Sequence, residues 1–207
     1  MHPISHLLIG WSLASAAGLE RRDRMLVTLA GLIPDLDGLG VVADVLTEKS
    51  RHPLYLYDQY HHVLLHNALF GLFLTLVALL FARRKALTPA LVAFSFHLHL
   101  LGDIAGSRGP DGDQWPIPYL SPFSDAWQLT WSHQWGLKAW PNVSVTLLLL
   151  AMTLYWAWQK GRSPLELVSS RADAALTRTL RARFGEPARR ADARDGVGPQ
   201  TFGTIDH

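Results

Sequence analysis

Five apolar segments, separated by polar or Gly/Pro-rich connections, constrain the fold of this chain more than any other feature. They cover residues 7–19, 25–33, 63–82, 87–101 and 143–158. All are too long or too continuous for surface strands, and no strand–turn–strand pattern lies between them. The sequence therefore predicts an all-α protein in which these segments pack as a multi-helix bundle.

The third segment, Val63–Ala82, is long enough to cross a membrane alone. It has 20 residues, and a helix of that length rises ~30 Å, about the thickness of the hydrocarbon core of a bilayer. The other segments are shorter, so they need flanking residues to span or they are buried helices of the bundle. Charged residues make up only 17% of the chain, against about 25% in an average soluble domain. We therefore expect the bundle to be embedded in a membrane and to contact membrane lipid.

Charge is distributed unevenly along the chain. Basic clusters follow the first, third and fifth segments, at residues 21–24, 83–85 and 160–162. If consecutive helices run antiparallel, these clusters lie at one end of the bundle, and the stretches rich in histidine and aspartate meet at the other. The positive-inside rule would place the basic end in the cytoplasm. Residues 1–159 carry 10 Lys/Arg against 11 Asp/Glu, a net charge of −1, which argues against binding of nucleic acid.

We divide the chain into three parts. Residues 1–160 form a helical domain that includes a long connection, residues 103–142, rich in glycine, proline and tryptophan. Such a connection is typical of a lid or binding loop or of an interfacial aromatic belt; a loop folded on a small core of its own is the structural alternative. Residues 161–184 have the spacing of a basic amphipathic helix. Residues 185–207 have the composition of a disordered tail.

The chain contains ten histidines and no cysteine. The lack of cysteine excludes a disulfide scaffold, a cysteine-ligated zinc site and a thiol nucleophile. Any metal site must therefore use imidazole and carboxylate ligands, which suit zinc, manganese or iron.

Histidine and aspartate gather in four short stretches, at residues 2–6, 34–38, 61–66 and 97–103. The last two contain the pairs His62/His66 and His99/Asp103, and residues at this i,i+4 spacing project from one helical face. Such groups inside an apolar helix are costly unless they are partnered or bind a metal. Each residue alone fits a core histidine or a helix cap, but four stretches meeting at one end favour a metal site.

These stretches resemble the membrane-bound metal-dependent hydrolases of the LexA-regulated inner-membrane type. The resemblance covers about residues 1–160 and rests on Ser5-His6-Leu7-Leu8, Gly31-Leu32-Ile33-Pro34-Asp35-Leu36-Asp37, His61-His62-Val63-Leu64-Leu65-His66-Asn67 and His99-Leu100-Leu101-Gly102-Asp103. The central motif of that family reads His-Arg-Gly-x-Thr-His-Ser, so this chain keeps its outer histidines as His61 and His66. The order of these residues is also distantly similar to that of the zinc-dependent bacterial phospholipase C group.

The resemblance implies a multi-pass hydrolase of the cell inner membrane with six metal-ligating residues, namely His6, Asp35, His62, His66, His99 and Asp103. It leaves open whether Asp35 or Asp37, and whether His61 or His62, is the ligand. We assign Asp37 and His61 to catalysis, as general base or as partners of the ligands. Because one catalytic zinc needs only three protein ligands, we expect one or two divalent ions, zinc first, with manganese or iron as alternatives.

We expect hydrolysis of a phosphoester, in a small molecule or a lipid, through a metal-activated water. The sequence contains neither the Gly-x-Ser-x-Gly motif nor a phosphate-binding Gly-x4-Gly-Lys loop. The main alternative is a non-enzymatic membrane protein that binds or transports a metal ion or a proton, which would carry polar residues near the middle of several helices. A third alternative, a soluble helical metalloenzyme, would be recovered without detergent.

Overall fold

The structure is a computed structural model that describes residues 1–109, 112 and 114–187. Its elements are α1 (Pro3–Ala16), α2 (Arg21–Ala30), the 3₁₀ helix η1 (Ile33–Leu39), α3 (Gly40–Thr47), α4 (Leu56–Tyr60), α5 (Ala68–Phe81), α6 (Leu87–Gly106), β1 (Ile117–Pro118), β2 (Gln128–Leu129), α7 (Trp140–Lys160), the 3₁₀ helix η2 (Pro164–Leu167) and α8 (Ser170–Phe184). The two strands have only two residues each and pair antiparallel. The prediction of an all-α bundle is therefore confirmed.

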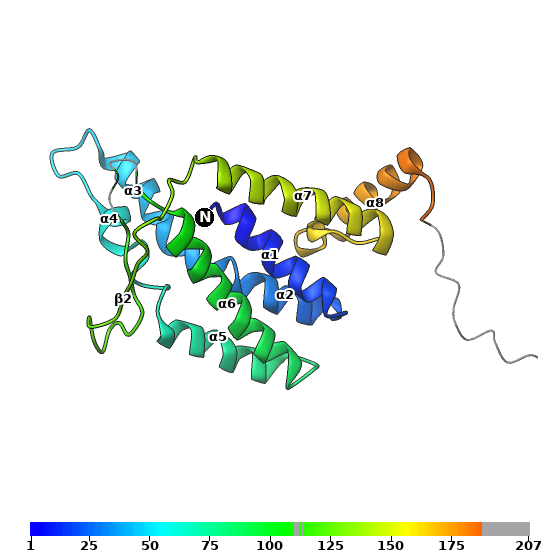
Figure 1. The fold of residues 1–207 in the computed structure, drawn as a ribbon, viewed down its shortest axis with the longest axis horizontal. Helices are drawn as coiled ribbons and strands as arrows, with labels where there is room; N and C mark the ends of the chain where they lie inside the picture. Colours follow the sequence, from blue (N-terminus) through cyan, green and yellow to red (C-terminus); the bar gives the residue numbers. More distant parts are fainter. Residues whose placement is uncertain (110–111, 113, 188–207) are drawn as a thin grey trace, which may run out of the picture.

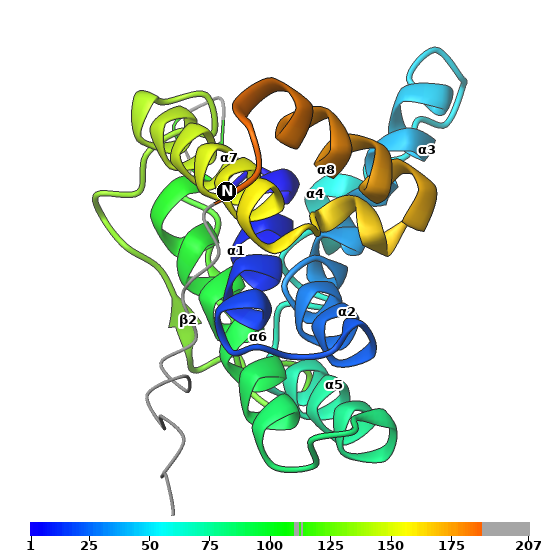
Figure 2. The ribbon, with the colours of Figure 1, turned by 90° about the vertical axis from the view of Figure 1, so that its right-hand side faces the viewer.

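Helix α1 lies at the centre of the bundle, in contact with α2, α6 and α7, and α5 packs on the other side of α6 (Figures 1 and 2). Small residues let α1, α2 and α6 approach closely. A Cβ at Gly10 would lie 3.0 Å from Thr28 Cα, and a Cβ at Gly31 would lie 2.8 Å from Ser95 Oγ. Helices in membranes associate through such small residues, because lipid provides no hydrophobic force between them.

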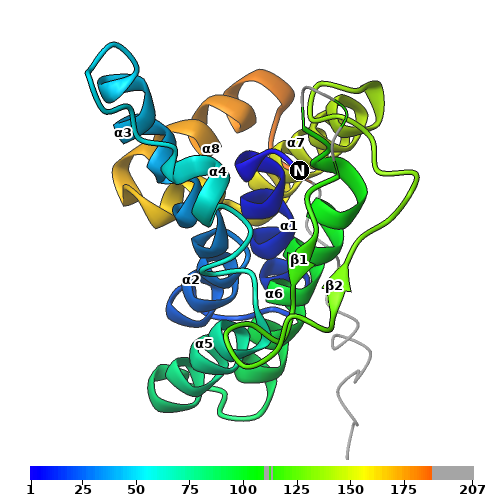
Figure 3. The same cartoon turned by 90° about the vertical axis from the view of Figure 1, so that its left-hand side faces the viewer.

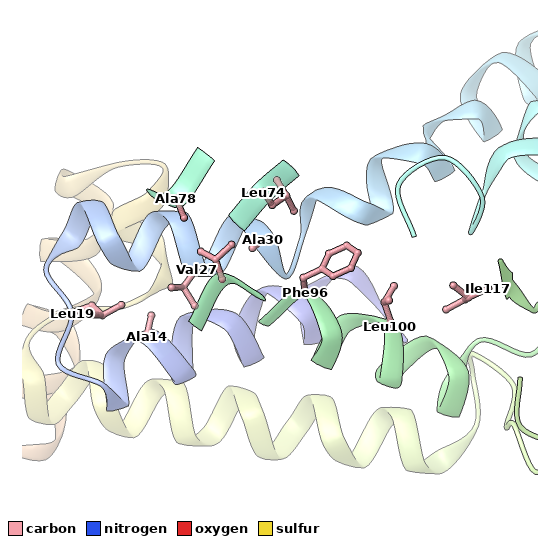
Figure 4. Packing of buried hydrophobic residues seen from close by; sticks show 10 residues of the cluster. Ala14, Leu19, Val27, Ala30, Leu74, Ala78, Phe96, Leu100 and Ile117 are labelled. Atoms are coloured by element: carbon pink, nitrogen blue, oxygen red, sulfur yellow. The ribbon is translucent and has the colours of Figure 1, made fainter. Parts of the chain in front are cut away.

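The apolar core fills the space between α1, α2, α5 and α6 (Figure 4). Its buried side chains are Ala14, Leu19, Val27, Ala30, Leu74, Ala78, Val92, Phe96, Leu100 and Ile117. Phe96 is completely buried, and a Cβ at Gly71 would lie 2.6 Å from its ring. The glycine therefore allows α5 to pack directly over this ring.

Large apolar side chains also cover the outside of the bundle. On α5 and α7 they include Leu72, Phe73, Leu80, Leu147 and Leu148, all more than half exposed. In the described part of the chain, α6 and α7 are long and apolar enough to cross a membrane, and α2 with η1–α3, bent by 47°, makes a third candidate. An apolar surface of this extent suits contact with lipid better than contact with water.

The prediction of one spanning helix over Val63–Ala82 is wrong. Helix α5 begins only at Ala68, because the Asn67 side chain caps it by accepting a hydrogen bond from the Phe70 backbone N–H (3.0 Å). Residues 61–67 form turns instead, with His62 at φ = 66°. The helix has 14 residues and a length of ~21 Å, so it is too short to span a ~30 Å core alone.

The C-terminal part also differs from the predicted single helix over residues 161–184. The structure divides this segment into η2 and α8, and a serine caps each piece: Ser163 accepts a hydrogen bond from the Leu165 N–H, and Ser169 accepts one from the Ala172 N–H. Serine is favoured at this position because its hydroxyl satisfies a free backbone N–H. Residues 188–207, most of the predicted disordered tail, lie outside the described residues.

The basic clusters lie at one end of the bundle. Asp23 accepts hydrogen bonds from the backbone N–H groups of Arg83 (2.9 Å) and Arg84 (3.0 Å), and Lys160 Nζ donates to the Ser15 carbonyl (3.1 Å). These contacts join the ends of segments that are distant in sequence. The basic ends therefore meet, as the antiparallel arrangement assumed in the prediction requires. That arrangement also puts the stretches rich in histidine and aspartate at the opposite end.

A buried ion pair between Arg24 and Glu166 attaches η2 to this basic end. Arg24 Nε donates to Glu166 Oε1 (2.7 Å), and Trp11 Nε1 donates to the same oxygen (3.0 Å). The side chains of Arg24 and Glu166 are only 4% and 6% exposed. Burial opposes ionisation of Glu166, but the hydrogen bonds from Arg24 and Trp11 outweigh it and keep the pKa of its carboxyl below the usual value.

At the opposite end, the α3–α4 arm projects from one side of the bundle, and the connection between α6 and α7, with β1 and β2, runs along the other side (Figure 3). Asn142 anchors this connection: its Nδ2 donates to the Gly106 carbonyl (2.7 Å), and its Oδ1 accepts from Trp135 Nε1 (3.0 Å). The β1–β2 pair brings Ile117 into the core. The connection is therefore folded onto the bundle, above the stretches that carry histidine and aspartate.

Candidate metal centre

Six buried or half-buried side chains from four segments converge at the end of the bundle below the connection. They form two overlapping groups, one of His6, Asp35, His99 and Asp103, and one of His62, His66 and Asp103. Within each group the potential ligand atoms lie within 4.8 Å of one another. These are the six residues that the sequence analysis selected as ligands, and Asp103 belongs to both groups.

The Asp103 carboxylate lies at the centre of the four histidines. Its Oδ1 is 3.1 Å from His6 Nε2, and its Oδ2 is 3.0 Å from His99 Nε2, 3.4 Å from His66 Nε2 and 3.9 Å from His62 Nε2. Asp103 is completely buried, yet Oδ2 has no well-aligned hydrogen bond with any described residue. Burial of a carboxylate oxygen without a partner is costly, so this oxygen requires a cation or a donated proton.

The hydrogen bonds of the histidines indicate a cation. His66 Nδ1 donates to Asp37 Oδ2 and His99 Nδ1 donates to the Gly31 carbonyl, both at 2.9 Å. The tautomers assigned from these acceptors leave a lone pair on each Nε2. The two Nε2 atoms are 3.0 Å apart and face Oδ2 of Asp103. Three electron pairs thus face one another where the two groups meet, and divalent metal bound by imidazole and carboxylate ligands fits such donors.

The electrostatics of the second group also favour positive charge. Burial alone lowers the pKa of His66, but its contacts with the Asp103 and Asp37 carboxylates outweigh burial and raise the pKa from 6.5 to about 9. Without metal, His66 therefore carries a proton on Nε2 at neutral pH, and a metal ion would take the place of that proton. Burial lowers the pKa of His62 to about 2, so this imidazole is neutral and keeps a lone pair. A neutral imidazole is the form that binds metals.

Asp37 lies behind the candidate ligands. It accepts hydrogen bonds from His66 Nδ1 and His61 Nδ1, both at 2.9 Å, and from the Leu65 backbone N–H at 3.2 Å. A carboxylate on the far nitrogen of a ligating histidine fixes the tautomer and the orientation of the ring. The structure thus places Asp35 and His62 within the two groups and Asp37 and His61 beside them.

We predict that an Asp37→Asn variant binds metal ~10–100-fold more weakly than the wild type, the typical cost of losing such a partner. The amide lacks the charge that attracts both imidazole N–H groups. Competition with a chelator, measured on detergent-purified protein, gives the affinity. Asp44→Asn is the matched control, because the Asp44 carboxylate accepts from the backbone N–H groups of Leu56 (2.7 Å) and Tyr57 (2.8 Å) and from no other described residue. Wild-type affinity in Asp37→Asn would contradict the role assigned to Asp37.

Several contributors to the site lie outside the residues selected from the sequence. The Gly31 carbonyl orients His99, Ser107 Oγ donates to Asp103 Oδ1 (2.9 Å), and the Met1 amino group contacts the same oxygen. Gly102 leaves room for His6, since a Cβ there would lie 2.9 Å from the His6 ring. Of these residues, only Gly31 and Gly102 could have been noticed in the sequence, because they lie within the motifs at residues 31–37 and 99–103.

Besides His61, two histidines of the four stretches lie outside the groups. His97 faces outward, with its ring nitrogens 2.7 Å from the Ala93 carbonyl and 2.9 Å from the Tyr119 hydroxyl. His2 precedes the first residue of α1 and belongs to neither group.

A cavity of about 1440 Å³ opens from the centre. Asp35, His62 and Asp103 line it on the side of the centre, and Trp115 lines it from the connection. The Trp115 ring stands edge-on to the rings of His61 and His62, at 5.4 Å between centroids. The connection thus covers part of the centre, as a lid would, while Phe123, Trp127 and Trp140 of the same region are exposed, as in an aromatic belt.

The comparison with known protein families agrees with the inner-membrane part of the resemblance. Residues 1–175 match the family described as YdjM inner membrane protein. No curated protein and no solved structure matches the chain. The family description names no enzymatic activity, and no comparison supports the likeness to phospholipase C. Because the match covers most of the chain, the protein belongs to the YdjM inner membrane protein family.

Proposed function

We propose that this protein is a multi-pass enzyme of the inner membrane that hydrolyses a phosphoester with the help of bound divalent metal. The observation that carries the proposal is the pair of overlapping groups that four histidines and two aspartates form beside an open cavity. Imidazole and carboxylate ligands next to a substrate-sized cavity are typical of metal-dependent hydrolysis.

The two groups divide the ligands between two ions. His6, Asp35 and His99 would hold one ion, His62 and His66 the other, and Asp103 would contact both. When bound, such a pair supplies Lewis acidity, lowers the pKa of water toward ~7 and steadies the attacking and leaving oxygens. We expect zinc, with manganese or iron as alternatives.

His61 is the residue that we propose for proton transfer. It lines the cavity, and its Nδ1 proton is held by Asp37 Oδ1 at 2.9 Å. This hydrogen bond leaves Nε2 free to accept a proton from water or to give one to the leaving oxygen, as in other carboxylate–histidine pairs. Tyr57 stacks on the His61 ring at 4.6 Å and Trp115 stands against its edge, so the ring is held in place and partly shielded from water.

The arrangement of the bundle favours hydrolysis over transport. A path for an ion or a proton needs polar groups through the middle of several helices. Here the ionisable groups of the centre gather at one end, and the apolar cluster around Val27, Phe96 and Leu74 fills the space toward the other. A site at one end of the bundle suits a reaction in which the substrate enters and the products leave on the same side of the membrane.

We predict that the zinc- or manganese-loaded protein in detergent hydrolyses p-nitrophenyl phosphate or bis(p-nitrophenyl) phosphate, and that a chelator stops the reaction. His61→Ala should lower kcat by ~10²–10⁴, the usual contribution of a general acid or base, without loss of bound metal. His97→Ala is the matched control because His97 faces outward. A fully loaded protein that hydrolyses neither ester would overturn the proposal.

A further inference from the structure

Two basic residues line the cavity beside the candidate metal centre and have no role in the proposed reaction. Arg108 and Lys138, from the start and the end of the connection, both line this cavity. Arg108 follows Ser107, whose hydroxyl donates to Asp103. The Arg108 side chain is therefore part of the cavity lining near Asp103, the residue that both groups of candidate ligands share.

The backbone and side chain of Arg108 are held by the connection. Its backbone N–H donates to the Trp135 carbonyl, and its Nη2 donates to the Ser132 carbonyl, both at 3.1 Å. Its Nε is buried and has no hydrogen-bond partner among the described residues. A buried N–H of a charged group without an acceptor is costly, so an acceptor brought by a ligand would complete the site.

A phosphate group is the acceptor that suits this position. The planar guanidinium offers parallel N–H donors that match two phosphate oxygens, and it remains charged at any physiological pH. Lys138 is exposed and adds a mobile positive charge to the same wall. Of the four aspartates that line the cavity, Asp35 and Asp103 would be neutralised by metal, which leaves Asp58 and Asp125 to face the positive charges of Arg108 and Lys138.

We propose that Arg108, together with Lys138, binds the phosphate of the substrate beside the metal centre and thereby selects phosphate esters. This assignment rests on the proposed function for the identity of the reacting group. The phosphate is carried either by a membrane lipid or by a soluble molecule. Leu39 and Leu137 line the same cavity, are 60% and 38% exposed, and provide an apolar wall that an acyl chain would contact.

The test is binding, measured apart from turnover. Isothermal titration of the metal-loaded protein with inorganic phosphate should give a dissociation constant that rises ~10–100-fold in Arg108→Gln, the loss expected for a charge-assisted hydrogen bond. Arg108→Lys should recover only part of the affinity, because it keeps the charge without the planar donors. Bound metal and melting temperature, measured on each variant, establish that the fold and the centre are intact.

Arg84→Gln is the matched control, because Arg84 is exposed at the opposite, basic end of the bundle. Equal phosphate affinity in Arg108→Gln and wild type, or an equal loss in Arg84→Gln, would overturn the assignment. Parallel titrations with dihexanoyl phosphatidic acid and with glycerol phosphate distinguish a phosphate carried by a lipid from one carried by a soluble molecule. Tighter binding of the lipid identifies a membrane substrate, and tighter binding of glycerol phosphate identifies a soluble one.

The two proposals fail in different ways. Phosphate binding that depends on Arg108, in a protein that hydrolyses no ester, would refute the proposed hydrolase and leave the phosphate site in place. Hydrolysis with the same kcat/KM in wild type and Arg108→Gln would refute the phosphate site and leave the hydrolase in place.

Discussion

An Asp103→Asn variant is expected to be purified with almost no bound metal, whereas the wild type retains one or two ions per chain. Asp103 belongs to both groups of candidate ligands, so this single change removes an oxygen ligand from each. It also removes the negative charge that four histidines surround. An asparagine side chain has nearly the same volume, which separates the loss of the ligand from a packing defect. Elemental analysis of protein purified in detergent measures the stoichiometry directly.

The matched control for this experiment is Asp58→Asn. Asp58 lines the same cavity but belongs to neither group, so its removal changes the charge of the cavity without touching the ligands. We expect this variant to keep its metal. Wild-type stoichiometry in Asp103→Asn would show that the centre does not depend on the residue around which it is arranged, and the metal assignment would have to be abandoned.

The second large effect concerns stability. Glu166→Ala is expected to lower the free energy of unfolding by about 3–5 kcal/mol, the usual cost of breaking a buried ion pair from one side. The change leaves the buried Arg24 guanidinium without its carboxylate and the Trp11 indole N–H without its acceptor. Unfolding in detergent, followed by tryptophan fluorescence, measures the loss.

Two companion variants define the cause of that loss. The double variant Arg24→Met, Glu166→Ala should recover most of the stability, because no unpaired charge remains in the interior. Glu20→Ala breaks the ion pair between Glu20 and Arg83, whose side chains are 60% and 62% exposed, respectively. This change should lower the free energy of unfolding by no more than about 1 kcal/mol. A loss in Glu20→Ala as large as that in Glu166→Ala would mean that burial is not the reason for the effect.

The same pair predicts a pH dependence. The pKa of Glu166 is lower in the folded protein than its ordinary value of 4.5. Its contribution to stability is therefore complete above pH ~4.5 and is lost as the pH falls through the folded-state pKa. Removal of Glu166 should make the stability of the protein less sensitive to acid in that range.

The helical class and the sorting of charge could be predicted from the sequence, because both depend on apolar segments and on where they stop. The boundaries of the third helix could not. Hydropathy continues from Val63 to Ala82, but the turns at residues 61–67 are fixed by contacts with distant residues. The Leu65 backbone N–H donates to Asp37, for example, at 3.2 Å. Local composition contains no information about such a partner.

The six candidate ligands chosen from the sequence are the residues that the two groups contain, but the geometry expected of one pair is wrong. His62 and His66 do lie together, but not on one helical face, since His62 has a positive φ and precedes α5. Their ring centroids are 4.6 Å apart because the turn folds back toward Asp103. The contact of the Gly31 carbonyl with His99 and the phosphate site proposed at Arg108 could not be predicted, because both depend on which distant segments the tertiary structure brings together.

The order of the candidate ligands along the chain has a consequence for biogenesis. His6 and Asp103 are in contact although they lie 97 positions apart in the sequence. The candidate ligands between them come from η1, from the turn before α5 and, as His99, from α6. At a synthesis rate of ~5–20 residues per second, Asp103 leaves the ribosome about 5–20 s after His6. Until α6 has been made, His6 lacks Asp103, the residue to which its ring is hydrogen-bonded in the folded protein. Binding of metal at the proposed centre would thus be a late step of assembly, because both groups of candidate ligands include Asp103.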